Sequence, residues 1–482
     1  MSQFSKCLEE YILLRNLSYV QLAKRTGINR TLLHHLVRGD RKPSDTEQVQ
    51  RLAEALSLSP AERRELIRLG KIAQLGEEVY QRRMAVQQML LRISPVEELP
   101  VGQVSERLED TLPVVCQGTA QVRALIKRVI DRECALSHGY LDFLGQPDDE
   151  FLLQLMQIAS ASAEMRIRHV LCFDNGPHAE TINIHSFGQL LSNLLAMRGY
   201  EAYYYYGSLA GSVSGMTPFP VLLLTSTCAM QIKADYSAAI ISTGSVHTLL
   251  IQSFQTALAE CHPLTRRVQD LWGCLENYMP FWEKVQMGEK EAFYYLVPEY
   301  SCTAFLNPEI IETYLAQDLP DREHLIAALT DSSKKSLKGV REYPLTQYIT
   351  REGVYSFLQT GRFSDCPDEF YQPLSPLHRA YILERSIACA KESDTYQLRL
   401  YDHDLLPFSN TLIVSTSAEG KVVNINCKSP TAGFVSLNLQ NPTIAAAISD
   451  YLASLLDTPM VSSKEDTIRW LESALKDFRN AH

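Results

Sequence analysis

The sequence predicts a multidomain protein, with an all-α N-terminal domain of five short helices followed by a mixed α/β region in which two similar stretches suggest a duplicated module. Its 482 residues exceed what one hydrophobic core normally holds, at roughly 150 residues per domain. Apolar residues recur at helical spacing up to about residue 90. After that point, short apolar runs bounded by polar turns become common, and such runs indicate strands.

Charge is distributed unevenly along the chain. Residues 1–92 carry 16 Lys and Arg against 10 Asp and Glu, so this part has a net charge of +6 although the whole chain has −10. Neutralising phosphates supplies most of the non-specific affinity for nucleic acids, so the basic end is the part expected to meet a polyanion. The acidic remainder should repel the same partner.

The N-terminal stretch MSQFSKCLEEYILLRN lacks the basic start and apolar run of a secretory signal, and no later segment has the apolar length of a membrane span. The 11 cysteines include no CxxC pair, so they fit neither a disulfide framework nor a structural zinc site. We therefore expect a cytoplasmic protein with reduced cysteines, without membrane contact, cofactor or metal.

The segment SYVQLAKRTGINRTLLHHLVRG predicts two helices joined by a tight turn. Ser18 and Gln21 have the spacing of a capping box, which satisfies free backbone N–H groups at a helix start. Gly27 ends this helix because glycine adopts a left-handed conformation at little cost. Asn29 can cap the second helix, and Gly39 closes it. This order of residues predicts a helix-turn-helix.

The second helix carries a polar stripe beside its apolar residues. Helical spacing groups Thr31, His34, His35 and Arg38 on one side, with Arg30 at the leading end. These side chains can hydrogen-bond to base edges, and Arg30 can address the O6 and N7 atoms of guanine. Adjacent histidines do not share a helix face well enough to chelate a metal, so no metal role is assigned to them.

Two cations follow this helix. Arg41 and Lys42 stand just beyond Gly39, where they can touch phosphates and fix register without reading sequence. A fourth helix is expected over residues 45–56, and a fifth begins at Pro60. Together these helices complete a five-helix domain over residues 1–72.

Residues 4–72 resemble the Xre family of lambda-repressor-like helix-turn-helix domains, through LSYVQLAKRTGINRTLLHHLVRGDRKPS and LAEALSLS. The resemblance implies that Arg30, Thr31 and His35 read bases and that Leu32 meets a thymine methyl group, while Tyr19 replaces a common Gln. It also implies a homodimer on half-sites about 34 Å apart. A helical docking module that no longer binds DNA is the alternative. The full predicted DNA-binding set is Tyr19, Gln21, Asn29, Arg30, Thr31, Leu32, His34, His35, Arg38, Arg41 and Lys42.

The remaining chain is divided by pattern into a helical linker or dimerisation region (73–148), a first α/β module (149–262), a mostly helical connector (263–376) and a second α/β module (377–482). Each module contains a helix, several apolar strands and a closing amphipathic helix. In this interpretation the strand MRIRHVLCFD of the first module corresponds to YQLRLYDHD of the second.

Ligand-site candidates follow these two strands, because α/β folds place ligands beyond strand ends. Surface turns explain such residues equally well. Tyr204 belongs to a tyrosine run that could line an aromatic pocket, although such a run is more typical of a half-buried strand. The candidates are Asp174, His178, Tyr204, Asp402 and His403.

The paired modules resemble degenerate phospholipase-D-like sensor domains, but none of the 12 histidines has a lysine two residues later, as that family's catalytic pattern requires. Other catalytic motifs are also missing, so no enzymatic activity is expected. The sequence thus predicts a homodimeric transcriptional regulator that binds double-stranded DNA, with a C-terminal region for sensing a small-molecule or protein effector or for oligomerisation. An enzyme tethered to DNA and a protein-binding scaffold are the alternatives.

Overall fold

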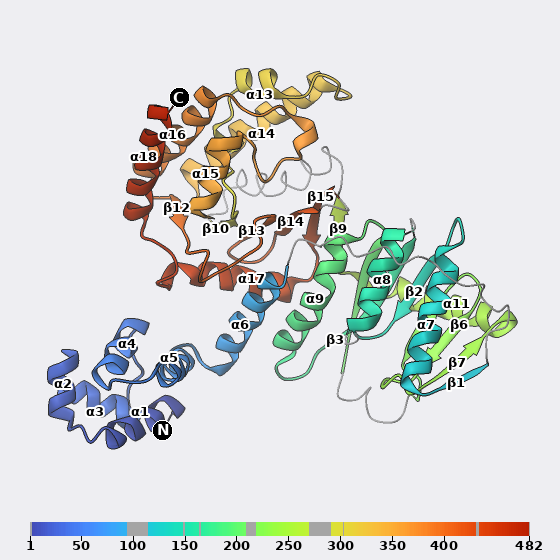
Figure 1. Cartoon of the computed structure of the whole chain (residues 1–482), viewed down its shortest axis with the longest axis horizontal. Helices are drawn as coiled ribbons and strands as arrows, with labels where there is room; N and C mark the ends of the chain where they lie inside the picture. Colours follow the sequence, from blue (N-terminus) through green and yellow to red (C-terminus); the bar gives the residue numbers. More distant parts are fainter. Residues whose placement is uncertain are drawn as a thin grey trace. The chain divides into compact units, whose positions relative to one another are not determined.

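The computed structural model describes residues 2–93, 114–147, 150–162, 165–208, 218–268, 291–301, 303–429 and 433–481. The chain divides into two compact units, Met1–Ala85 and Val86–His482. The first is helical, and the second contains two mixed sheets with helices (Figure 1). The predicted fold class, a helical N-terminal domain followed by a mixed α/β region, is confirmed. Residues 94–113 of the predicted linker lie outside the described residues.

The described part of the N-terminal unit contains the five predicted helices, in the predicted order. They are α1 (Gln3–Leu14), α2 (Tyr19–Thr26), α3 (Arg30–Arg38), α4 (Thr46–Ala55) and α5 (Pro60–Leu75). A further helix, α6 (Glu77–Leu91), spans the boundary between the units. The core beneath α1 to α5 includes Leu8, Leu22 and Leu52, each completely buried. Apolar residues at helical spacing therefore form this small core, as the sequence predicted.

The first sheet has eight strands in the order β1-β7-β6-β5-β2-β3-β4-β8. The strands are β1 (Val115–Gln117), β2 (Tyr140–Leu144), β3 (Arg166–Asp174), β4 (Tyr200–Gly207), β5 (Val221–Leu224), β6 (Ala229–Ile232), β7 (Ala238–Ser242) and β8 (His262–Pro263). Its helices are α7 (Thr119–Cys134), α8 (Glu150–Ser162), α9 (Ala179–Ala196) and α11 (Gly244–Ala259). β2, β3 and β4 run parallel, and parallel neighbours need long crossovers, which α8 and α9 provide.

The second sheet has seven strands in the order β12-β11-β10-β13-β14-β15-β9. The strands are β9 (Thr265–Val268), β10 (Phe293–Leu296), β11 (Leu345–Ile349), β12 (Tyr396–Leu400), β13 (Leu412–Ser417), β14 (Val423–Ser429) and β15 (Gly433–Leu439). Its helices are α13 (Pro308–Tyr314), α14 (Arg322–Glu342), α15 (Arg351–Thr360), α16 (Pro376–Glu392), α17 (Pro442–Ser454) and α18 (Lys464–Ala481), with short 3₁₀ turns at Thr303–Phe305, Asp368–Phe370 and Leu455–Asp457.

The two sheets share one plan. Each sheet contains three adjacent parallel strands, which are β2, β3 and β4 in the first sheet and β10, β11 and β12 in the second. Three antiparallel strands follow beside them. A short edge strand that comes first in the sequence, β1 or β9, pairs with the last of these three. The order of strands along the chain is also the same. This shared topology is what a duplicated module would produce.

The strand correspondence expected from the sequence is wrong. By position in the sheets, β3 corresponds to β11 and β12 corresponds to β4, so MRIRHVLCFD and YQLRLYDHD are not equivalent. Residues 263–376, expected as a connector, supply β9, β10 and β11 to the second sheet as well as α13, α14 and α15. These strands have only four or five residues each, too few for an alternating pattern to stand out between long helices.

His169 is an unusual core residue of β3. Its ring is completely buried, with Nε2 2.9 Å from the Gly145 carbonyl oxygen and Nδ1 2.6 Å from Tyr200 Oη. A neutral imidazole satisfies both contacts, since Nε2–H donates to the carbonyl and Nδ1 accepts from the hydroxyl. Burial disfavours the charged ring and lowers the pKa of His169 to about 4.

This lowered pKa predicts an acid-sensitive C-terminal unit. The unfolded chain binds a proton at His169 near pH 6.5, whereas the folded chain does so only near pH 4, so stability is fully present above pH 6.5 and is lost as the pH falls. We expect the unfolding free energy to decrease by about 2 kcal/mol from this residue between pH 8 and pH 5. His169→Gln should remove that part of the pH dependence in urea denaturation.

The exposed His178 supplies the control for this measurement. His178→Gln should leave the pH dependence as in the parent protein. An unchanged acid slope in His169→Gln would contradict the assignment to the buried ring.

Candidate nucleic-acid interface

The turn between α2 and α3 is built by local hydrogen bonds and one buried side chain. The Ser18 hydroxyl accepts from the Gln21 N–H group, and Gln21 Oε1 accepts in return from the Ser18 N–H group at 2.9 Å. Gly27 has a φ of +71° and ends α2. Ile28 is buried beneath the turn, and Asn29 Oδ1 accepts from the Thr31 N–H group at 2.8 Å. The predicted capping box, glycine stop and asparagine cap are confirmed.

The inner side of α3 is fixed to the core of the N-terminal unit. Leu33 and Leu36 are completely buried and Val37 nearly so. The Ser5 hydroxyl of α1 donates to the Leu36 carbonyl oxygen at 2.7 Å. Gly39, with a φ of +79°, ends the helix. This packing turns the opposite side of α3 toward solvent.

Most of the predicted DNA-binding side chains lie at the surface of this unit. The exposed ones are Gln21, Asn29, Arg30, Thr31, His34, Arg38, Arg41 and Lys42, whereas Tyr19, Leu32 and His35 are partly buried. Arg30, Thr31, His34 and Arg38 thus form the exposed side of α3, which we call the α3 face. Their hydrogen-bonding groups are of the kinds that read base edges in the major groove.

Several predicted residues already have structural partners. The Gln21 amide oxygen is used in the capping box. The Tyr19 ring stands edge-on to the His34 ring, with centroids 6.0 Å apart, and Leu32 packs against the core. His35 Nδ1 lies 3.2 Å from Asp40 Oδ2. This acidic neighbour of His35 was not foreseen, because Asp40 follows the end of the helix and reaches back.

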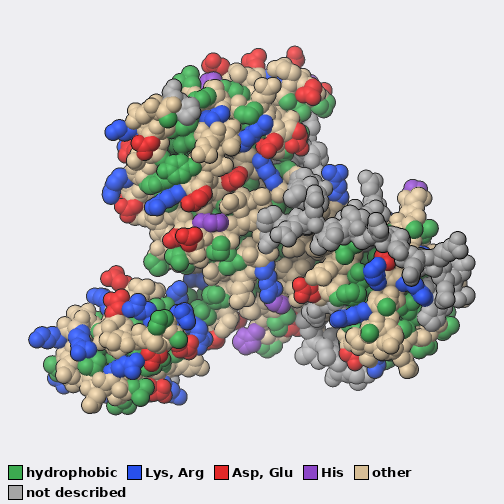
Figure 2. All heavy atoms as spheres, in the orientation of Figure 1, with side chains coloured by type: hydrophobic (Ala, Val, Ile, Leu, Met, Phe, Trp, Pro, Cys, Tyr) green, Lys and Arg blue, Asp and Glu red, His purple; other side chains and the backbone are tan. Residues whose placement is uncertain are grey.

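Cations flank the α3 face. Arg41 is exposed, and Lys42 is exposed with its Nζ 3.5 Å from the Gln74 carbonyl oxygen. Figure 2 shows Lys and Arg side chains spread over the visible side of the N-terminal unit, with Asp and Glu side chains between them. The α3 face itself contains no acidic residue, so its own side chains, rather than a uniformly basic surface, distinguish it.

The five ligand-site candidates do not form one site. Asp174 is buried at the end of β3, where its backbone N–H and carbonyl groups bond to the Asn183 side chain. His178 is exposed, with a φ of +64° before α9. Tyr204 is buried against the Phe173 ring, 4.9 Å away between centroids. Packing and a tight turn account for these three positions.

Asp402 and His403 lie beyond β12, the edge strand of the second sheet, whereas β3 is central in the first. Asp402 Oδ1 accepts from the Asp404 N–H group at 3.0 Å, which forms a local turn. The expectation that the two groups follow equivalent strands is therefore wrong. Both groups follow a predicted strand in the sequence, but the order of strands in the sheets separates them.

Sequence reasoning missed a cavity in the second sheet's half of the molecule, whose polar lining includes Tyr295, Ser301, Asp365 and Ser415. Three of these residues, Tyr295, Ser301 and Asp365, lie in the expected connector, and no sequence motif links them with Ser415. In the described parts of the chain, no three His, Cys, Asp or Glu side chains gather as metal ligands would. Nor does any described helix have the length and apolar character needed to cross a bilayer.

Comparison with known proteins identifies the N-terminal unit. A family model described as a helix-turn-helix domain matches residues 4–66. No curated protein matches the chain. Among solved structures, the chain is similar to a polyphosphate kinase from Porphyromonas gingivalis, at 10% identity and a TM-score of 0.24, over 75% of this chain and 53% of that one. The chain spans about half the length of that enzyme, and a superposition this poor supports no inference about activity.

Proposed function

We propose that this chain is a sequence-specific transcriptional regulator that reads duplex DNA with the α3 face. The observation that carries the proposal is the packing of α3, which buries Leu33 and Leu36 and leaves Arg30, Thr31 and His34 exposed. The helix-turn-helix match over residues 4–66 supports it, because in this motif the second helix enters the major groove. Arg41 and Lys42 would contact phosphates beside the groove.

The proposal includes a homodimer in the cytoplasm, as in the Xre-like domains that the sequence resembles. Two copies would place their α3 helices on half-sites about 34 Å apart. Val86–His482 would set this spacing in response to an effector. An effector can shift such an equilibrium only if it binds the DNA-competent arrangement with a different affinity from the alternative. The proposal assigns no catalytic step to the chain.

Arg30→Ala tests the base-reading role. We expect specific binding to weaken by about 1–3 kcal/mol and base preference to relax at one position, because a paired hydrogen bond to guanine is lost. The preferred site is first selected from a random duplex pool with the full-length protein. Fluorescence anisotropy then compares that duplex with single-base variants and with random DNA.

Lys42→Gln is the matched comparison, since it also removes one exposed cation. Its loss should weaken all duplexes about equally and flatten the slope of log affinity against log salt by about one unit. If both variants bound selected and random DNA as the parent does, the docking of α3 would be wrong.

A further inference from the structure

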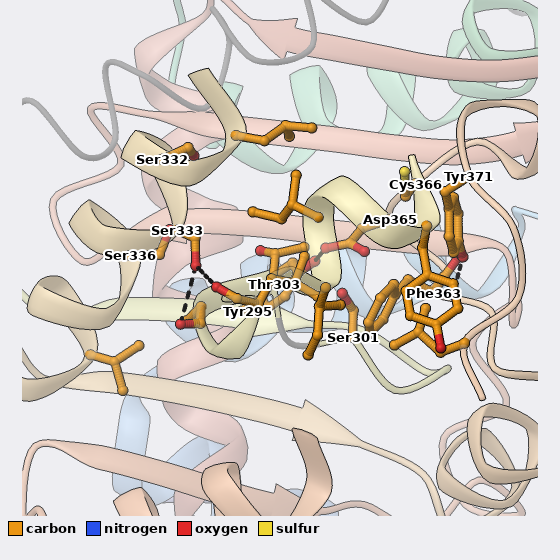
Figure 3. A pocket seen from close by; sticks show the side chains of 18 of the residues that line it. Tyr295, Ser301, Thr303, Ser332, Ser333, Ser336, Phe363, Asp365, Cys366 and Tyr371 are labelled. Carbon is orange, nitrogen blue, oxygen red and sulfur yellow. Dashed lines mark hydrogen bonds between the residues drawn. The ribbon is translucent and has the colours of Figure 1, made fainter. Parts of the chain in front are cut away.

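A cavity of about 200 Å³ lies between the second sheet and the helices α13 and α14. Most of its lining is apolar, with Leu306, Ile310 and Leu329 among the contributors. In Figure 3, serines of α14 line one side, and Phe363, Cys366 and Tyr371 lie on the other, with Asp365 and Tyr295 between them. A cavity of about 150 Å³ holds a benzene molecule. By the same proportion, this one has room for about eight non-hydrogen atoms.

The sheet contributes a polar row to the floor of the cavity. Ser415, Tyr295 and Gln347 are directly paired across β13, β10 and β11, so their side chains share one face. Gln347 is engaged at both ends, since its Nε2 donates to the Ser301 carbonyl oxygen at 2.6 Å and its Oε1 accepts from Tyr396 Oη at 2.9 Å. Gln347 therefore serves as a fixed part of the wall.

Asp365 is the acidic group of the cavity. Its Oδ2 accepts from Tyr295 Oη at 3.0 Å, and the Ser301 hydroxyl also lies near the carboxyl group. Burial raises the pKa of Asp365, and the Ser301 and Tyr295 hydroxyls and the charge of Lys428 offset that rise only in part. Nearby Lys428 instead donates to the Phe363 carbonyl oxygen and pairs with Asp368, both at 3.1 Å. Among the described residues, no cation forms an ion pair with Asp365.

Three buried polar atoms at this cavity have no hydrogen-bond partner of good geometry within the described parts of the chain: Asp365 Oδ1, Ser301 Oγ and Ser415 Oγ. Folded proteins rarely leave such groups unsatisfied, and each one costs about 1–3 kcal/mol. Their grouping around one mainly apolar space is the arrangement of a small-molecule site, with few polar groups that orient the ligand.

The loop that carries Asp365 is held in place. Arg362 donates to the Asp368 and Tyr371 carbonyl oxygens at 2.8 and 2.6 Å, and Lys428 ties the same loop to β14. The carboxyl group is therefore preorganised, as a binding group must be to recognise a ligand without a large entropic cost.

We propose that this cavity binds a compact primary amine, with its ammonium group at Asp365 and an aromatic or branched aliphatic body of about eight non-hydrogen atoms against the apolar wall. The ammonium group donates to Asp365 and to the two serine hydroxyls, and it supplies the cation that the buried carboxylate lacks. The apolar body displaces water from the rest of the space. This site is independent of the proposed DNA binding.

Calorimetric titration of the full-length protein tests the proposal with 2-phenylethylamine, 2-phenylethanol and phenylacetate, which share one ring and differ in the polar group. We expect saturable binding of the amine, at least tenfold tighter than the alcohol, and none of the carboxylate. Asp365→Asn should weaken amine binding at least tenfold and leave the alcohol nearly unchanged. Glu369→Gln removes one exposed negative charge four residues away, outside the cavity lining, and should change neither.

Hydrogen exchange should show protection of α14 and residues 363–374 by the amine. The proposal is overturned if the alcohol binds as tightly as the amine, if Asp365→Asn binds the amine as the parent does, or if none of the three probes saturates at about 10 mM, which would indicate a hydrated cavity only. The preference among the probes in the parent protein decides the question even if Asp365→Asn does not fold. All titrations omit DNA, so this outcome and that of the DNA experiments remain separate.

Discussion

Replacing Leu36 by alanine should destabilise the N-terminal unit by about 2–5 kcal/mol and weaken specific DNA binding with it. Leu36 is completely buried where α3 packs on the core, and its carbonyl oxygen accepts from Ser5 of α1. The shortened side chain leaves a cavity that the surrounding helices fill only in part. Small domains have total stabilities of about 5–15 kcal/mol, so this loss removes a large part of the stability and increases the fraction of molecules in which α3 is released.

Hydrogen exchange of the full-length protein measures this effect locally, because peptides from α1 to α5 should exchange faster while those of the two sheets do not. Leu13→Ala provides the control, since Leu13 is 72% exposed on α1 and its truncation opens no cavity. If the amides of α3 were equally protected from exchange in the parent and in Leu36→Ala, the packing of Leu36 on the core would not be what keeps this helix in place.

Replacing Arg168 by methionine should destabilise the first sheet by about 3–5 kcal/mol. Arg168 of β3 makes a two-pronged ion pair with Asp142 of β2, with Nε donating to Oδ1 at 2.7 Å and Nη2 to Oδ2. The Asp142 side chain is almost completely buried, so the substitution leaves a carboxylate in the core without its cation. Urea denaturation followed by circular dichroism measures the loss, and hydrogen exchange of β2 and β3 assigns it to this sheet.

The double variant Arg168→Met with Asp142→Leu separates the stability that the ion pair contributes from the cost of leaving the buried Asp142 carboxylate without a cation. Buried pairs replaced by apolar side chains are often close to neutral, so the double variant should recover most of the stability lost in Arg168→Met. A double variant no more stable than Arg168→Met would mean that Arg168 acts mainly through its other contacts, with Gln255 and the Phe254 ring.

The N-terminal unit could be predicted in detail because its signals are local. Ser18, Gly27, Asn29 and Gly39 each fix the backbone within a few residues, and the structure shows all four in the expected conformations. The exposure of Arg30 and His34 follows directly from the helical period of the buried leucines. What the sequence did not indicate was the contact of Asp40 with His35, because it depends on the side-chain conformation beyond the helix end.

The sheets were less predictable because strand order depends on contacts between distant segments. The apolar run of β3 was recognised as a strand, but its neighbours β2 and β4 come from residues 140–144 and 200–207. The β11 residues LTQYI include β-branched and aromatic side chains typical of strands, but a run of five residues is too short to stand out between helices. Asp365 illustrates the same limit, since its meeting with Tyr295 joins positions 70 residues apart that no local pattern relates.

Each sheet begins and ends within one uninterrupted stretch of chain, residues 115–263 for the first and 265–439 for the second. In each sheet the earliest strand lies next to the last of the three antiparallel strands that follow the parallel set, β1 beside β7 and β9 beside β15. During synthesis, all strands of the first sheet can therefore pair before the strands of the second sheet leave the ribosome. Tandem duplication of one gene segment would give this arrangement and leave the strand pairing within each sheet intact. Later divergence could then change one sheet while the other kept its strand pairing.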